Sequence, residues 1–254
     1  MKKTLGCIRK ADTDFRLIDH GDRITVGVSG GKDSLLLLHA LSLYRKFSHK
    51  DFSLQAVTVD NGLSETDYSR ISDLCCQLQI PFIIKRTQIG EIVFGYRKEK
   101  NPCSLCAKMR RAVLAKACLE TGSNKLALGH HRDDVIETLL LSLLHEGRFR
   151  TFHPRTTMSR TGITVIRPLV YLPEYHVRHM EKVLDLPVIR SSCPANGKTE
   201  RETAAELLRG LRKKFPDAPE RFLHALQHEP YELWQRSLSD TDPEQDAFSP
   251  DSGK

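Results

Sequence analysis

Short apolar runs alternate along the chain with longer segments whose apolar residues recur at helical spacing. The short runs predict strands at 24–28, 54–59, 81–85, 125–128, 163–166 and 187–189. The longer segments predict helices at 33–47, 66–79, 102–120, 135–144, 173–184, 200–215 and 218–227, with a short helix near 15–18. Strands that alternate with helices in this way predict an α/β fold: a doubly wound, Rossmann-like parallel sheet with a helical C-terminal extension.

Three segments break the pattern. Residues 89–101 predict a loop or frayed helix, residues 145–162 predict a long loop, and the acidic residues 237–254 predict a disordered tail. The pattern divides the chain into four parts: a basic N-terminal segment at 1–22, a main domain at 23–215, a C-terminal helix at 216–236 and the tail at 237–254.

The charge of the chain favours a polyanionic partner. The formal net charge is +7, but the tail holds five carboxylates and one lysine, so residues 1–236 carry +11. No amphipathic anchor or long apolar span is evident, so we expect a cytoplasmic protein that binds nucleic acid rather than a membrane. Arginines interleaved with aromatic residues in the 145–162 loop suit RNA, although a basic loop anchored by one phenylalanine is the plain alternative.

A glycine-rich turn joins the first strand to the first long helix, with the sequence Val-Gly-Val-Ser-Gly-Gly-Lys-Asp-Ser at 26–34. A helix N-terminus offers unpaired backbone N–H groups, Gly30 and Gly31 let the backbone approach an anion, and Lys32 adds a full charge. The turn is not a Walker A motif, because its glycines are too closely spaced and Asp33 follows the lysine. We therefore expect a phosphate site of another kind.

Polar residues follow two other strands at the same predicted edge. Asp60 ends the second strand, and Gly-His-His-Arg-Asp-Asp follows the fourth at 129–134. Because ligands of doubly wound sheets bind at the carboxyl ends of the strands, Asp60 is placed to meet an adenosine. The pair Asp133 and Asp134 is also what a helix N-cap and a first-turn acid would look like, so a purely structural role stays open for either carboxylate.

The run Ser-Gly-Gly-Lys-Asp-Ser at 29–34 resembles the signature of the PP-loop ATP pyrophosphatases. That resemblance implies cleavage of ATP between the α- and β-phosphates to adenylate a substrate. An ordinary glycine-rich turn is the alternative, but six specified residues at a strand–helix junction make a chance match a poor explanation.

Seven cysteines, an odd number, argue against a disulfide framework. Cys103-x-x-Cys106 at a helix start could be a redox pair, half of a zinc site or an iron–sulfur ligand pair. Cys118 lies twelve residues after Cys106 on the same predicted helix, about 18 Å from it at a rise of about 1.5 Å per residue, so it cannot complete a zinc site. Cys193 follows the last predicted strand and can arrive at the same sheet edge. Three thiolates on an iron–sulfur cluster would leave one iron free to hold sulfide.

Five motifs together resemble the TtcA family of tRNA 2-thiocytidine synthetases over roughly residues 20–230. They are Ser-Gly-Gly-Lys-Asp-Ser at 29–34, Pro-Cys-Ser-Leu-Cys with Lys-Met-Arg-Arg at 102–111, Leu-Gly-His-His-Arg-Asp-Asp at 128–134, Val-Ile-Arg-Pro-Leu at 165–169, and Cys193. The resemblance implies ATP, Mg²⁺ and a [4Fe-4S] cluster held by Cys103, Cys106 and Cys193. It also implies a tRNA partner and 2-thiocytidine at position 32 of the anticodon loop as product.

Two differences from related proteins bear on this resemblance. The 2-thiouridine synthetases of the TtuA type share the core but carry paired-cysteine zinc fingers at their ends, whereas Cys7 stands alone here and no cysteine follows Cys193. Ser191 and Ser192 precede Cys193 where some TtcA-type proteins have a further cysteine, so three cysteines remain as the cluster ligands that the resemblance implies.

The resemblance implies a role for each residue at the sheet edge. Lys32, Asp33, Asp133 and Arg110 would be catalytic, with Arg110 and Arg111 binding pyrophosphate or tRNA phosphate. His130 and Asp133 would lie where the adenylated base must sit, and Asp33 or the pair Asp133 and Asp134 would hold Mg²⁺. The nucleotide-binding residues would be Ser29, Gly30, Gly31, Lys32, Asp33, Ser34, Asp60, Gly129, His130 and Asp134.

Three other functions stay open at this point. One is a lysidine-type or other PP-loop tRNA ligase without a cluster. The second is a tRNA 2-thiouridine synthetase, and the third is a non-catalytic ATP- or tRNA-binding protein with structural zinc. The sulfur donor, a cysteine desulfurase or sulfide, and the oligomeric state, with a homodimer among the options, are likewise open.

Overall fold

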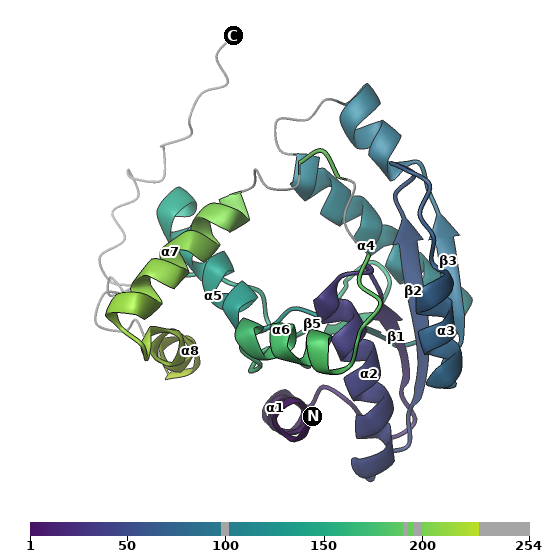
Figure 1. Cartoon of the computed structure of the whole chain (residues 1–254), viewed down its shortest axis with the longest axis horizontal. Helices are drawn as coiled ribbons and strands as arrows, with labels where there is room; N and C mark the ends of the chain where they lie inside the picture. Colours follow the sequence, from purple (N-terminus) through teal and green to yellow (C-terminus); the bar gives the residue numbers. More distant parts are fainter. Residues whose placement is uncertain (98–101, 190–192, 196–199, 229–254) are drawn as a thin grey trace, which may run out of the picture. The chain divides into compact units, whose positions relative to one another are not determined.

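The computed structural model describes residues 1–97, 102–189, 193–195 and 200–228 (Figure 1). The chain forms two compact units, Met1–Pro219 and Glu220–Lys254. The second unit is described only as far as His228, within helix α8 (Ala218–His228). Every cavity and side-chain cluster discussed below belongs to the first unit.

Six strands form one sheet in the order β3-β2-β1-β4-β6-β5. They are β1 (Arg23–Gly27), β2 (Ser53–Asp60), β3 (Phe82–Arg86), β4 (Lys125–Ala127), β5 (Arg155–Thr157) and β6 (Thr164–Ile166). All neighbouring pairs are parallel except β5 and β6. The strand order runs outward in opposite directions from β1 and β4, so the carboxyl ends of these two strands flank the crevice where a doubly wound sheet binds its ligand.

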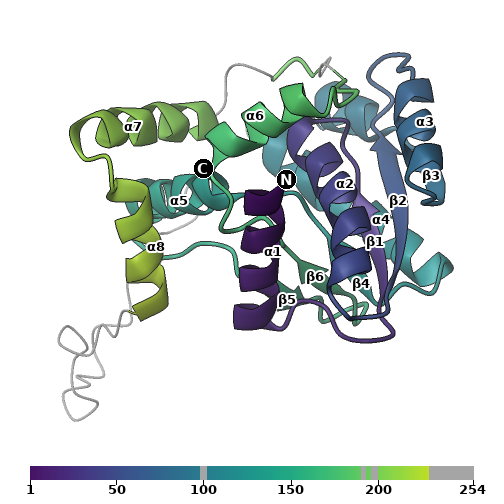
Figure 2. The same cartoon turned by 60° about the horizontal axis from the view of Figure 1, so that its bottom comes forward.

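The helices of the first unit are α1 (Lys2–Phe15), α2 (Lys32–Phe47), α3 (Ser69–Gln77), α4 (Pro102–Glu120), α5 (Arg132–Leu141), α6 (Glu174–Val183) and α7 (Glu200–Lys214). Two short π-helical segments, η1 (Glu91–Tyr96) and η2 (Ser142–Glu146), complete it. In Figure 1, α2 and α4 lie on opposite sides of the strands, and α7 lies beside α5 in both Figure 1 and Figure 2. None of the helices that the structure describes is long and apolar enough to cross a membrane.

The core explains why the apolar runs form strands. One buried cluster joins Val57 and Val59 of β2, Leu126 of β4 and Val165 of β6 to Leu114 of α4 and its neighbours. On the other side, four consecutive leucines of α2 at 35–38 have no exposed surface. Strands covered on both faces need apolar residues at nearly every position, which is the pattern of the short runs.

Two of the sequence-based predictions about strands are wrong. Residues 187–189 form no strand: the segment instead crosses the glycine-rich turn, where the Ile189 N–H donates to the Gly30 carbonyl over 2.9 Å. The predicted 145–162 loop contains the edge strand β5, whose three exposed residues carry no apolar pattern and pair with β6 through the backbone. Short edge strands of this kind give little signal in the sequence.

Helix boundaries differ from the predictions in two informative places. The first helix runs from Lys2 to Phe15 rather than over 15–18. Its sequence carries little sign of a helix, because its buried residues are Thr4, Ile8, Ala11 and Asp12, of which only two are apolar. The helix expected from Val135 begins three residues earlier, at Arg132, where His131 caps it. The acidic tail at 237–254 lies outside the described residues.

A buried carboxylate fixes α1 against α2. Asp12 accepts hydrogen bonds from the Tyr44 hydroxyl at 2.7 Å, the Lys50 ammonium at 2.6 Å and the backbone N–H of Ile18 at 2.9 Å. Its side chain is 2% exposed. Removing it would leave three donors without their acceptor.

We expect Asp12→Ala to lower the free energy of unfolding by about 3 kcal/mol, because a buried charged acceptor is lost. Urea unfolding of the full chain measures this change. Asp73→Ala, at an exposed position of α3, is the control and should change the value by less than about 0.5 kcal/mol. Equal effects of the two substitutions would show that Asp12 does not hold α1 in place.

Candidate active site

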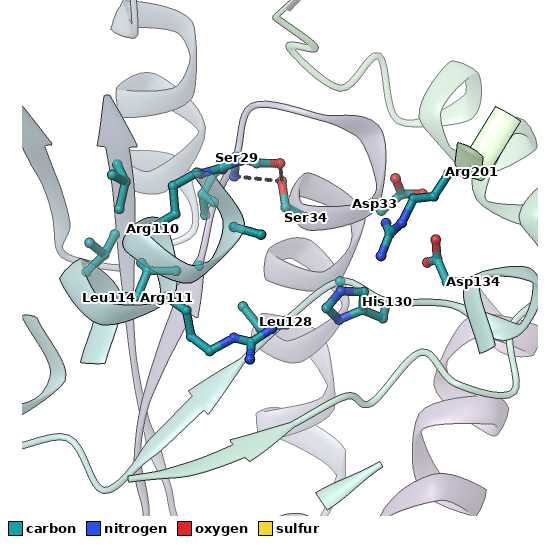
Figure 3. A pocket seen from close by; sticks show the side chains of 16 residues that line it. Ser29, Asp33, Ser34, Arg110, Arg111, Leu114, Leu128, His130, Asp134 and Arg201 are labelled. Carbon is teal, nitrogen blue, oxygen red and sulfur yellow. Dashed lines mark hydrogen bonds between the residues drawn. The ribbon is translucent and has the colours of Figure 1, made fainter. Parts of the chain in front are cut away.

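A pocket of about 320 Å³ opens at the carboxyl ends of β1, β2 and β4 (Figure 3). Its apolar wall comes from β2, α4 and the residue after β4, including Val57, Leu114 and Leu128. Its polar wall comes from the glycine-rich turn, from two arginines of α4 and from the loop between β4 and α5. An apolar wall facing a row of donors is the arrangement that a nucleotide needs.

The glycine-rich turn is held by its own serines. The Ser29 N–H donates to the Ser34 Oγ at 3.1 Å, and the Ser34 Oγ donates to the Gly31 carbonyl at 2.9 Å. Gly30 has a φ of +82°, in the left-handed region that suits glycine. Gly31 is the N-cap of α2 and makes no side-chain cap bond, so the first N–H groups of the helix stay available to an anion.

Lys32 is held between two carboxylates. Its ammonium lies 3.1 Å from Asp33 and 3.3 Å from a Glu174 oxygen at the start of α6. Burial works to lower the pKa of Lys32, but the two carboxylates outweigh it and raise the pKa above its usual range. Lys32 therefore carries its charge throughout the neutral range, which suits the phosphate contact expected of it.

The loop after β4 packs directly on the start of α2. A Cβ at Gly129 would lie 2.9 Å from the Asp33 carbonyl carbon and 2.9 Å from the Ser34 nitrogen, both backbone atoms. Only glycine permits this approach. The contact brings the polar residues that follow β4 to the edge of the glycine-rich turn at 26–34, which is the predicted phosphate loop.

His131 and Asp134 form a reciprocal cap at the start of α5. The His131 ring accepts from the Asp134 N–H, and the Asp134 carboxylate accepts from the His131 N–H at 2.8 Å. The His131 Nε2 also lies 3.6 Å from Asp33. Asp134 therefore has the structural role at the helix start that the sequence left open. It also lines the 320 Å³ pocket, together with Asp33.

Asp133 lies beside the pocket, among the residues that line a neighbouring groove of about 650 Å³. It does not line the 320 Å³ pocket, and its side chain is 4% exposed. One oxygen accepts from the Arg212 guanidinium at 2.9 Å and the other from the Glu174 N–H at 2.5 Å. The carboxylate therefore joins α5, α6 and α7, and a catalytic role for it stays an untested prediction.

His130 lines the pocket and packs against Phe152. Its ring centroid lies 4.9 Å from that of Phe152. The guanidinium of Arg167, the residue after β6, lies 4.9 Å from the same Phe152 centroid. Burial, together with the nearby arginines, lowers the pKa of His130 to about 3. The ring is therefore neutral at pH 7 and can donate or accept a hydrogen bond but supplies no charge.

Arg110 connects the pocket to a second cavity. Its Nε is buried and has no hydrogen-bond partner among the described residues, and its side chain lines both spaces. The second cavity, of about 280 Å³, is also lined by Asp60, Ile189 and Cys193. Arg110 thus lies between the nucleotide-sized pocket and the last cysteine.

The three predicted cluster cysteines lie near one another. Cys103 and Cys106 are in the first turns of α4, and Cys193 is half-buried in the second cavity. Burial raises the pKa of Cys106, Arg110 opposes that rise, and Cys193 and Cys103 add to it, so the three thiols lie within electrostatic range. Among the described residues, no group of three His, Cys, Asp or Glu side chains is arranged to hold a metal ion. The donor set suits an iron–sulfur cluster, but the thiols do not converge on one point.

The remaining cysteines are packing residues or lie apart. Cys75 and Cys118 are buried, Cys76 is exposed, and the Cys7 thiol lies 3.7 Å from the Tyr171 carbonyl. Cys118 belongs to the core cluster between α4 and the sheet. Of the adjacent residues Cys75 and Cys76, Cys75 is the one that packs in the core.

A groove of about 650 Å³ adjoins the pocket on the other side of the loop after β4. It contains three functional candidates that the sequence analysis missed: Glu137, Glu174 and Arg201. Burial, reinforced by Asp134, Glu174 and Asp133, raises the pKa of Glu137 to about 7. The sequence could have indicated Glu137, because it lies one turn after Asp134 on the same helix. No pattern in the sequence pointed to Glu174 or Arg201.

Comparison with known proteins agrees with this geometry. The PP-loop domain family matches residues 7–201 of the chain. The chain is therefore a PP-loop protein. The tRNA-cytidine(32) 2-sulfurtransferase of Anaeromyxobacter dehalogenans (strain 2CP-C) is 36% identical over 240 residues, which cover 93% of this chain and 83% of that protein. The protein with the same name from Geobacter metallireducens is 36% identical over 241 residues, covering 93% and 94%.

These relatives identify the chain more closely: it belongs to the tRNA-cytidine(32) 2-sulfurtransferase family. Among solved structures, the U34-tRNA thiolase NcsA from Methanococcus maripaludis with its [4Fe-4S] cluster matches with a TM-score of 0.71 and 24% identity. That match covers 90% of this chain and 79% of NcsA, and it confirms the predicted fold.

We expect Gly129→Ala to weaken ATP binding at least tenfold, because the new Cβ must push the loop after β4 away from the start of α2. Isothermal titration of ATP into the full chain measures the affinity. Gly210→Ala, in α7 with open space around its Cβ position, is the control and should bind ATP as the wild type does. Unchanged affinity in Gly129→Ala would mean that this contact does not shape the phosphate site.

Proposed function

We propose that this protein thiolates a cytidine of tRNA, at position 32, in an ATP-dependent reaction that uses a [4Fe-4S] cluster. The observation that carries the proposal is the position of Arg110, which lines both the pocket beside the phosphate loop and the cavity that contains Cys193. An adenylating site and a thiol site that share one wall suit a reaction in which activation and sulfur transfer act on the same base. The names of the relatives supply the substrate.

The first half of the proposed reaction is adenylation. The cytosine O2 attacks the α-phosphorus of ATP, a new O–P bond forms, and the bond to the β-phosphate oxygen breaks to release pyrophosphate. Lys32, the N–H groups at the start of α2 and Arg110 are the groups available to hold the phosphates and the departing pyrophosphate. Asp33 and Asp134 both line the pocket and suit Mg²⁺, which takes one or two carboxylates together with phosphate oxygens.

The second half is sulfur transfer. Sulfur at the oxidation level of sulfide, as HS⁻, attacks C2 of the base. The C2–O2 bond breaks, AMP leaves with the electron pair of that bond, and the S–H proton is lost to solvent. Cys103, Cys106 and Cys193 would hold the cluster, which would supply the site that carries sulfur to the base.

The proposed reaction also requires a surface that binds the phosphates of tRNA outside the pocket. Arg148 and Arg150 are exposed in the segment after η2 and remain candidates for phosphate contacts. Arg212, at the basic end of α7, is paired with Asp133, so a substitution there would disturb the site itself. The sulfur donor, a cysteine desulfurase or sulfide, and a homodimer remain predictions.

We expect Cys193→Ser to lose both the cluster and thiolation while ATP affinity stays at the wild-type level. A serine oxygen is a poor replacement for a thiolate on iron, and Cys193 is outside the pocket beside the phosphate loop. Iron and acid-labile sulfide after anaerobic reconstitution, and 2-thiocytidine formed in an unmodified tRNA transcript, measure the two losses.

Cys118→Ser is the matched control, because Cys118 is a buried packing residue of the core cluster on the same helix as Cys103 and Cys106. It should keep the cluster and the activity and lose some stability at most. Retention of the full cluster by Cys193→Ser, with loss in Cys118→Ser, would overturn the assignment. Absence of any thiolated cytidine with the reconstituted wild type would overturn the proposed function.

A further inference from the structure

The groove of about 650 Å³ beside the phosphate loop is lined by Lys32 and also by residues that have no role in holding ATP as described above, Glu137 and Tyr175 among them. It shares Asp33, Asp134 and Arg201 with the nucleotide-sized pocket. Figure 3 shows these three side chains together at one side of the pocket. A ligand in the groove would therefore meet a nucleotide in the pocket at this shared boundary.

The rim of the groove has the chemistry of a single-stranded RNA site. Tyr175, in the first turn of α6, is 56% exposed and is held in place by Lys3, whose ammonium donates to its hydroxyl at 2.8 Å. Arg178 and Arg209 lie along the same rim and are mostly exposed. An exposed aromatic ring next to arginines is suited to stacking a base and binding its flanking phosphates.

The floor of the groove contains one carboxyl group that lacks a donor. Glu137 is half-buried, and no hydrogen bond or ion pair joins its side chain to another described residue. Asp133, Asp134 and Glu174 surround it on the α5 and α6 sides, and each of them has donors of its own. The groove thus holds an unfilled hydrogen-bond acceptor beside the site where adenylation takes place.

We propose that this groove binds the target cytidine of the RNA strand and that Glu137 accepts a hydrogen bond from the 4-amino group of the cytosine. The inference rests on the proposed function, which requires a base to reach the α-phosphate of ATP. A carboxyl group is the side chain that accepts from cytosine N4, whereas uracil presents a carbonyl acceptor at the same position.

The two ends of the cytosine edge fit the two ends of the site. N4 and O2 flank N3 on the same edge of the ring, so a base held at N4 keeps O2 free at the opposite end. With N4 at Glu137, O2 points toward the boundary formed by Asp33, Asp134 and Arg201. Glu137 is accordingly a specificity-determining residue and takes no part in bond making.

Binding of a stem-loop RNA to the full chain tests this contact without requiring catalysis. Three RNAs carry, at the target position, cytidine, uridine or the 2-pyrimidinone nucleoside, which is cytidine without its 4-amino group. At pH 8.5, where the Glu137 carboxyl group is mostly ionised and acts only as an acceptor, the wild type should bind the cytidine RNA about tenfold more tightly than either of the others. Glu137→Ala should bind all three equally, at the level of the wild type with 2-pyrimidinone.

Two further variants separate the contact from general damage. Glu137→Gln keeps the shape of the side chain but adds a donor for the uracil carbonyl, so it should bind the cytidine and uridine RNAs equally well. Glu181→Gln, on α6 and outside the groove, should behave as the wild type does. Persistence of the tenfold preference for cytidine in both Glu137→Ala and Glu137→Gln would overturn the inference.

The outcome is distinguishable from failure of the proposed function. If the wild type thiolates the cytidine transcript but the Glu137 variants keep its preference, only the groove is misassigned. If the wild type forms no thiolated cytidine, the proposed function fails, and the binding pattern of the three RNAs still decides what Glu137 contacts.

Discussion

The buried carboxylate of Asp133 joins the helices that surround both the pocket and the groove. It accepts from the Arg212 guanidinium on α7 and from the Glu174 N–H at the start of α6, while it belongs itself to the first turn of α5. A charge that is almost fully removed from water is tolerated only when donors surround it. The three helices therefore have little freedom to move independently.

This constraint reaches the phosphate loop through one further residue. The Glu174 N–H is fixed by Asp133, and the Glu174 carboxylate lies 3.3 Å from the Lys32 ammonium. On the other side, α7 packs on α5 and brings Arg201 to the shared boundary of the two spaces. The position of the loop's only full positive charge and the position of Arg201 thus depend on the same carboxylate.

The sequence predicted local features well and long-range contacts poorly. The residues at 29–34 could be placed because a strand, two glycines and a helix start fix the loop without help from distant residues. Asp133 could not be distinguished from a catalytic acid, because its partners lie 41 and 79 residues away. The sequence predicted that a strand at 187–189 would bring Cys193 near Cys103 and Cys106. Residues 187–189 form no strand, and the hydrogen bond from the Ile189 N–H to the Gly30 carbonyl instead holds the chain across the glycine-rich turn.

The most direct test of this dependence is the ATP affinity of Arg212→Ala compared with that of Arg209→Ala, which lies one turn earlier on α7. Neither residue lines the nucleotide-sized pocket. If Asp133 transmits the position of α7 to Glu174 and Lys32, Arg212→Ala should bind ATP several-fold more weakly, and Arg209→Ala should bind it as the wild type does. Wild-type ATP affinity in both variants would show that the phosphate loop is held independently of Asp133.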